Sequence, residues 1–268
     1  MRKFMNLVYL EVNRIAKLFF IALAAYFSIS CIWVFCTARG YMKSIVESAQ
    51  NSNMSIAKYL ESCGAVPYQG RDILSGNYGL TAGAVFMMIL VGVYAFLIWY
   101  RDWFGSNKTV YSLLVLPVNR MKIFAAKAVT IILMGCSVVS TFLIGIAASF
   151  YIDKAILDKV IIKNVTLLDA FSAAIDITAY KKIDIVLFAL CAICVIFLFV
   201  LLERSFKIKG IILGIVIGAA YLVLNGVVAT SMYLYTGEKI LLIAVIQLVF
   251  LAASIAYSNH LIKKKVAV

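Results

Sequence analysis

The stretch YGLTAGAVFMMILVGVYAFLIWY, residues 78–100, contains no charged side chain. A helix that rises about 1.5 Å per residue needs roughly 20 apolar residues to cross the ~30 Å hydrocarbon core of a bilayer. This stretch therefore has the length and composition of a membrane-spanning helix. Five more stretches have both properties, with Asp184 at the edge of one as their only charged residue: 18–38, 128–151, 183–202, 211–233 and 240–259.

The composition of the whole chain favours the same fold class. Hydrophobic residues make up 65% of the 268 residues and charged residues only 14%, against roughly a quarter in soluble domains. A soluble helical bundle would need charged faces on most of its helices, and these stretches have none. We therefore predict an all-α membrane protein with six transmembrane helices. Six spans and their connections leave no room for a soluble domain, so residues 1–268 are predicted to form a single membrane domain.

The formal net charge of +13 is distributed unevenly between the connections. If both termini are cytoplasmic, the cytoplasmic segments hold 15 Lys or Arg and three acids, and the external segments with Asp184 hold 10 and nine. The positive-inside rule favours this orientation. The basic excess is then a topology signal, and a nucleic-acid partner has no support. The cytoplasmic segments are 1–17, 101–127, 203–210 and 260–268, and the external ones are 39–77, 152–182 and 234–239.

The N-terminal residues have an amphipathic pattern. On a helical wheel one face is apolar and the opposite face polar: Met5, Val8, Val12, Ile15 and Phe19 against Arg2, Asn6, Asn13 and Lys17. Such a helix suits the inner membrane surface, before the chain turns into the first span. Glu11 falls on the apolar side. Because an unpaired charge there is costly, Glu11 either pairs with a cation or reaches water.

Catalytic or cofactor chemistry has little support in this sequence. The chain has one histidine, and the apolar stretches hold no carboxylate except at one edge. We predict no catalytic, cofactor or metal site. Asn225 and Gln247 are the strong polar groups at depth, where they either join helices by hydrogen bonds or contact a substrate. Glycines recur every four residues in the fifth stretch, which indicates either close helix packing or ordinary tolerance of glycine: Gly210, Gly214 and Gly218.

If this protein is a transporter, the six apolar stretches offer no charged group away from their edges for ion coupling, so its energy would come from another source. Ion-coupled carriers usually place ionisable groups within the membrane, although sodium sites built from backbone in broken helices are an alternative. The chain has no Gly-Lys dipeptide, which excludes a nucleotide-binding P-loop.

The connection 101–127 offers a place for a partner. After a basic entry it carries an apolar turn and a proline, which ends a short helix at the cytosolic surface. Such an apolar patch outside the membrane favours contact with another protein. The residues of this turn are Thr109, Val110, Leu113, Leu114, Leu116, Pro117 and Arg120.

Together with Lys127, the spacing of these residues resembles the type-two family of ABC transporter permeases, the exporter half that carries no ATPase. The resemblance implies that the turn is a coupling helix, which docks into a partner ATPase that binds ATP and Mg. It also implies a second permease subunit, identical or homologous, and Glu11 matches an acid that the family often carries in its first helix. Phe104 and Lys108 depart from the acid and glycine of many members.

From this resemblance we expect a permease subunit of an ATP-driven exporter in the cytoplasmic membrane of a bacterium. Both termini would be cytoplasmic, and the cargo hydrophobic or amphipathic: a peptide antibiotic, a drug or a lipid-like molecule. The alternatives are a self-sufficient secondary transporter or channel, and a membrane scaffold or sensor that transports nothing.

Overall fold

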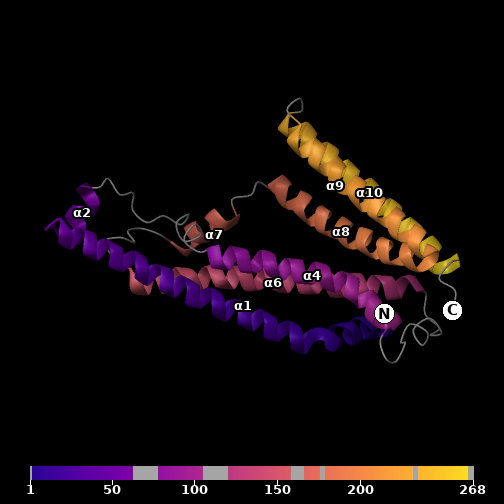
Figure 1. The fold of residues 1–268 in the computed structure, drawn as a ribbon, viewed down its shortest axis with the longest axis horizontal. Coiled ribbons are helices and arrows are strands. Elements are labelled where there is room, and N and C mark those ends of the chain that lie inside the picture. Colours follow the sequence, from indigo (N-terminus) through magenta and orange to yellow (C-terminus); the bar gives the residue numbers. More distant parts are fainter. Residues whose placement is uncertain are drawn as a thin grey trace. The chain divides into compact units, whose positions relative to one another are not determined.

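The computed structural model describes residues 2–62, 78–104, 120–157, 166–175, 179–231 and 235–264 (Figure 1). Within these ranges the regular structure is entirely helical, so the all-α prediction is confirmed. The helices are α1 (Arg2–Asn51), α2 (Ile56–Ser62), α4 (Tyr78–Phe104), α6 (Arg120–Ile156), α7 (Leu167–Ile175), α8 (Ala179–Phe206), α9 (Ile208–Thr230) and α10 (Thr236–Lys264).

Six of the described helices are long and apolar enough to cross a membrane, which supports the prediction of a multi-pass membrane protein. The six predicted stretches lie on α1, α4, α6, α8, α9 and α10. One boundary is wrong: α9 ends at Thr230, short of the predicted 233, because Ser231 leaves the helical conformation with φ −57° and ψ 127°.

Two helices are longer than a bilayer requires. α1 has 50 residues and α6 has 37, which correspond to about 75 and 55 Å at 1.5 Å per residue. Each must therefore extend past the ~30 Å hydrocarbon core. The N-terminal residues, predicted as a separate surface helix, are continuous with the first span in α1.

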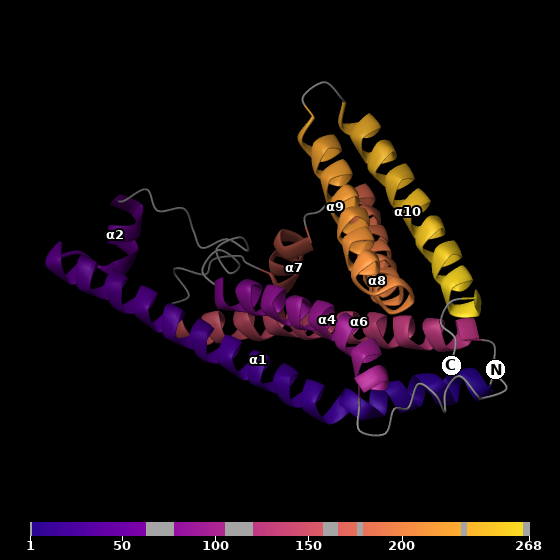
Figure 2. The same ribbon diagram turned by 45° about the vertical axis from the view of Figure 1, so that its right-hand side comes forward.

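The chain forms two compact units, each assembled from separate stretches of sequence. The first contains Met1–Ile15, Leu90–Met134 and Ile177–Val268, and the second Ala16–Ile89 and Gly135–Asp176. In the first unit α8 packs along both α9 and α10, and Figures 1 and 2 show these three helices side by side. Outward-facing apolar side chains on α9 and α10, such as Ile212 and Leu248, suit a lipid environment.

A single residue, Lys207, connects α8 to α9. Its φ of 52° and ψ of −126° match the first central position of a type II′ turn, which favours glycine. A non-glycine residue there stores roughly 1–3 kcal/mol of strain. The two helices approach closely next to this turn: a Cβ on Gly210 of α9 would lie 2.0 Å from the Leu202 carbonyl oxygen of α8.

In the second unit α1, α4 and α6 approach one another at glycines. A Cβ on Gly83 would lie 2.5 Å from the Tyr26 ring, and one on Gly145 would lie 2.5 Å from the Leu80 side chain. The Tyr26 hydroxyl also donates a hydrogen bond to the Leu80 carbonyl oxygen, at 2.9 Å. Missing side chains thus let these apolar helices pack closely.

The short helix α7 has a reciprocal cap at its N-terminus. The Thr166 hydroxyl and backbone N–H donate to the Asp169 carboxylate at 2.7 and 2.8 Å, and the Asp169 N–H donates to the Thr166 hydroxyl at 3.3 Å. The hydrogen bonds from the Thr166 hydroxyl and backbone hold the pKa of Asp169 below its ordinary value. This is a capping box with aspartate in place of glutamate.

Gly210→Ala should destabilise the α8–α9 pair, because the added methyl meets backbone rather than a movable side chain. Overpacking of this kind costs about 1–3 kcal/mol. Gly218→Ala is the matched control, since nothing lies within 4 Å of its would-be Cβ. Thermal unfolding of the purified protein in detergent measures the difference, and equal midpoints for both variants would contradict the close approach.

The cap of α7 should weaken in acid. Because the folded-state pKa of Asp169 is lowered, its stabilisation is present above the ordinary aspartate pKa of about 4 and is lost as the pH falls through the lowered value. Amide hydrogen exchange of α7 should therefore lose protection at low pH, and Asp169→Asn should remove that pH dependence. The same pH dependence in the Asn variant would refute this role.

Candidate functional site: a buried charge cluster

Five charged side chains meet in the first compact unit, and we refer to them as the charge cluster: Glu11, Arg14, Arg101, Asp102 and Lys127. The first two lie on α1, the next two near the end of α4, and the last near the start of α6. Every member comes from the sequence segments 1–17 and 101–127, directly outside the apolar stretches. The cluster thus joins three helices beside the ends of their apolar parts.

Lys127 is the centre of the cluster, with a side chain only 1% exposed. Its ammonium group donates to Glu11 Oε1 at 2.9 Å, to the Ile98 carbonyl oxygen at 3.1 Å, and to Asp102 Oδ2. A lysine ammonium has three N–H donors, and these contacts occupy all of them. The Trp99 ring also lies 5.1 Å from the nitrogen, within cation–π range.

The two carboxylates are also buried. The Glu11 and Asp102 side chains are 6% and 1% exposed. Arg101 donates to Glu11 Oε2, and Arg14 donates to Asp102 Oδ1 at 3.1 Å. Both acids therefore have at least two cationic partners. The side chains of Arg101 and Arg14 are 31% and 36% exposed, so they lie at the solvent-facing edge of the cluster.

The burial of Glu11 follows from the sequence pattern around it. Val8 and Val12 lie on the same helix face, where they pack with Ile123 and Ala126 at the start of α6. Glu11 lies between Val8 and Val12 in the sequence, on the same apolar side of α1. Of the two alternatives that the sequence left for Glu11, pairing with cations is the one the structure contains.

Aromatic side chains surround the cluster. Trp99, Phe124 and Phe197 form an aromatic group that links α4, α6 and α8, with ring centroids 5.2–6.4 Å apart, and Phe197 meets both other rings edge to face. The Tyr94 hydroxyl accepts a hydrogen bond from Arg101 Nη1 at 2.8 Å. In a buried, largely apolar setting of this kind, the attraction between opposite charges is stronger and the cost of leaving any one charge unpaired is higher.

The third acid of the basic segments is also engaged. Glu203 on α8 accepts a hydrogen bond from the Tyr100 hydroxyl. The neighbouring Arg204 guanidinium lies 5.5 Å from the Tyr100 ring and 5.3 Å from the Trp103 ring. These contacts attach the end of α8 to α4 next to the charge cluster.

The cluster spans the two ends of segment 105–119. Asp102 lies two residues before the end of α4 at Phe104, and Lys127 lies seven residues after the start of α6 at Arg120. Their direct ion pair joins the end of α4 to the start of α6.

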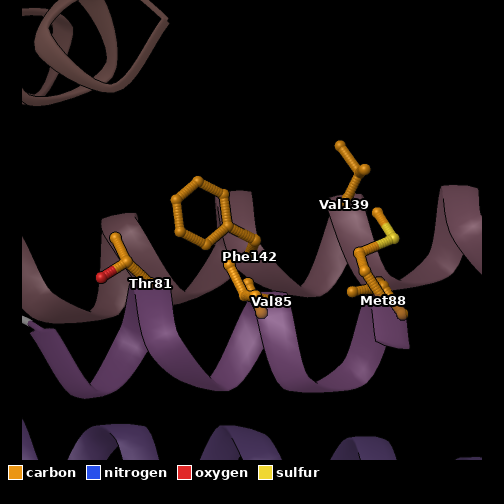
Figure 3. Close-up of a pocket in the computed structure, with 7 residues that line it drawn as sticks. Thr81, Val85, Met88, Val139 and Phe142 are labelled. Atoms are coloured by element: carbon orange, nitrogen blue, oxygen red, sulfur yellow. The ribbon is translucent and has the colours of Figure 1, made fainter. Parts of the chain in front are cut away.

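A separate apolar groove lies in the second unit between α4 and α6 (Figure 3). Its volume is about 260 Å³, and it is lined by Thr81, Ala84, Val85, Met88, Val138, Val139 and Phe142. Figure 3 shows the Phe142 ring beside Val85, with Thr81 and Met88 on either side along α4. This groove suits an apolar chain rather than a charged ligand.

The other predicted site residues are placed as follows. Gly210 and Gly214 are buried against α8, where a Cβ on Gly214 would lie 2.4 Å from the Phe199 ring, while Gly218 has open space. Asn225 donates to the Tyr221 carbonyl oxygen of its own helix at 2.7 Å. Gln247 is buried, and its Oε1 accepts no hydrogen bond from the described residues.

The predicted coupling turn lies outside the described residues, namely Thr109, Val110, Leu113, Leu114, Leu116 and Pro117. Of that set only Arg120 is described, as the first residue of α6. Among the described residues, no group of three His, Cys, Asp or Glu side chains could hold a metal ion.

Sequence reasoning missed the partners of Glu11. A usable signal was present: segments 1–17, 101–127, 203–210 and 260–268 together hold three acids and 15 basic residues, and Asp102 and Glu203 each stand next to an arginine. Acids kept within strongly basic segments are candidates for ion pairs. Which cations they meet depends on helix packing, which spacing along the chain does not give.

Comparison of the chain with protein-family models, with curated proteins and with solved structures gives no match.

Lys127→Met should strongly destabilise the first unit. The variant keeps most of the side-chain volume but leaves two buried carboxylates without their shared cation, and breaking a buried pair this way costs about 3–5 kcal/mol. Lys122→Met on the same helix is the matched control, because Lys122 is exposed. Thermal unfolding and membrane abundance are the measurements, and a Lys127 variant as stable as the control would show that the cluster adds no stability.

Proposed function

We propose that this chain is the membrane-spanning permease subunit of an ATP-driven ABC exporter. Its partners would be an ATPase subunit that binds ATP and Mg, and a second permease subunit, identical or homologous. The observation that carries the proposal is the charge cluster, which ties together the two ends of segment 105–119 and the start of α1.

This arrangement suits a subunit that receives energy from outside. The apolar turn at Leu113 and Leu114 belongs to that segment, so a partner bound there would act on a junction of three helices rather than on a loose connection. Because ion pairs in a dry, apolar setting are costly to break, the junction would move as a unit.

The expected cargo is hydrophobic or amphipathic, such as a peptide antibiotic, a drug or a lipid-like molecule. The groove between α4 and α6 supports this class, because its lining has no charged side chain. The expected location is the cytoplasmic membrane of a bacterium with both termini inside, which rests on the basic excess of segments 1–17, 101–127, 203–210 and 260–268.

A proton-coupled secondary transporter is a second candidate, because such carriers also bury carboxylates and lysines. The positions in this chain favour the exporter. All five charges flank the apolar stretches rather than lying at mid-span, and each buried acid is paired with at least two cations within the cluster. A non-transporting scaffold would not need a rigid junction at this segment.

Replacing both Leu113 and Leu114 with Asp should abolish association with the ATPase, because each buried apolar anchor contributes about 1.5–3 kcal/mol and the new charges oppose docking. The measurement is vanadate-sensitive ATPase activity that co-purifies with the tagged chain, beside ATP-dependent uptake of a lipophilic peptide by inverted vesicles. Leu168→Asp is the control, since Leu168 is 79% exposed on α7.

Two results would contradict the proposal. One is unchanged ATPase association and uptake in the double Asp variant at normal membrane abundance. The other is uptake that needs no ATP but stops when a protonophore collapses the proton gradient, which would establish the secondary transporter instead.

A further inference from the structure

A basic turn joins α8 to α9 at the edge of the membrane. We define the basic turn as Arg204, Lys207 and Lys209. One candidate span ends at Phe206 and the next begins at Ile208, so a single residue connects them. Two apolar helices joined by one residue cannot carry that residue far from the membrane surface, because the chain between them has no length to spare.

The turn presents its charge outward. Lys207 and Lys209 are exposed, and Ile208 between them is 74% exposed. Glu203, the acid that directly precedes Arg204, accepts a hydrogen bond from the Tyr100 hydroxyl. An exposed apolar side chain flanked by cations is typical of a surface that lies at the boundary between headgroups and acyl chains.

The conformation of Lys207 indicates that its side chain has a use. Its φ of 52° and ψ of −126° suit glycine, and glycine would form this turn without strain. A lysine in this position keeps a cation at the tip of the turn at the expense of backbone strain. Strain retained at one residue is a reason to look for a ligand of that residue.

We infer that the basic turn binds the phosphate of an anionic phospholipid headgroup, with Lys207 and Lys209 as the direct contacts. Phosphates are the anions found at this depth, and two exposed cations on either side of an apolar residue match a headgroup above its acyl chains. The Arg204 guanidinium lies within cation–π range of both the Tyr100 and the Trp103 ring, and it adds positive potential beside the turn. This inference is independent of the proposed exporter function.

The test uses the purified full-length protein in a neutral detergent. Its thermal midpoint is followed during titration with phosphatidylglycerol, with phosphatidylcholine, or with soluble glycerol phosphate. Phosphatidylglycerol should raise the thermal midpoint until the site is saturated, and the other two compounds should leave the midpoint unchanged. A lysine near an anionic surface contributes about 1 kcal/mol to the binding free energy. The affinity for phosphatidylglycerol should therefore fall about five-fold in Lys207→Gln and about 25-fold in the double Lys207→Gln, Lys209→Gln variant.

Two further variants separate charge from backbone strain. Lys207→Gly should lower the affinity for phosphatidylglycerol as much as Lys207→Gln does. It should also raise the thermal midpoint measured without lipid, because the backbone strain is relieved. Lys43→Gln is the control for loss of one charge elsewhere, since the Lys43 side chain is 78% exposed on α1, and it should bind phosphatidylglycerol normally. Equal stabilisation by phosphatidylcholine, or full phosphatidylglycerol affinity in the double variant, would overturn the inference.

Discussion

The buried ammonium group of Lys127 is the constraint on which the first compact unit depends. A cation that is 1% exposed must be surrounded by acceptors, and here they come from α1 and α4. Because Glu11, Asp102 and the Ile98 carbonyl must all reach one nitrogen, the start of α6 has little freedom to shift against either helix. The aromatic group of Trp99, Phe124 and Phe197 then brings α8 to the same junction.

This junction gives physical content to the proposed energy coupling. The apolar spans approach one another closely at glycines, whereas the charge cluster is a set of directional, buried ion pairs. Under the proposed function, a partner bound at segment 105–119 would act on the helices that the cluster joins.

Much of the fold was predictable from the sequence, because an uncharged apolar stretch of about 20 residues has few alternatives to a membrane helix. The same sequence placed Glu11 on an apolar face and required a partner or a route to water. It could not select Lys127 and Arg101, since those cations are separated from Glu11 by a hundred residues or so and meet it only through packing. The turn at Lys207 was equally hidden, because no local rule predicts a lysine in a glycine conformation.

The most direct test of the charge cluster as one coupled unit is a double-mutant cycle between Lys127→Met and Asp102→Asn. The free energy of unfolding would be measured in mixed micelles for the parent protein, both single variants and the double variant. If the two groups form a shared buried ion pair, the double variant should be more stable than the sum of the single effects implies, by about 1–3 kcal/mol. Additive effects within about 0.5 kcal/mol would contradict the account.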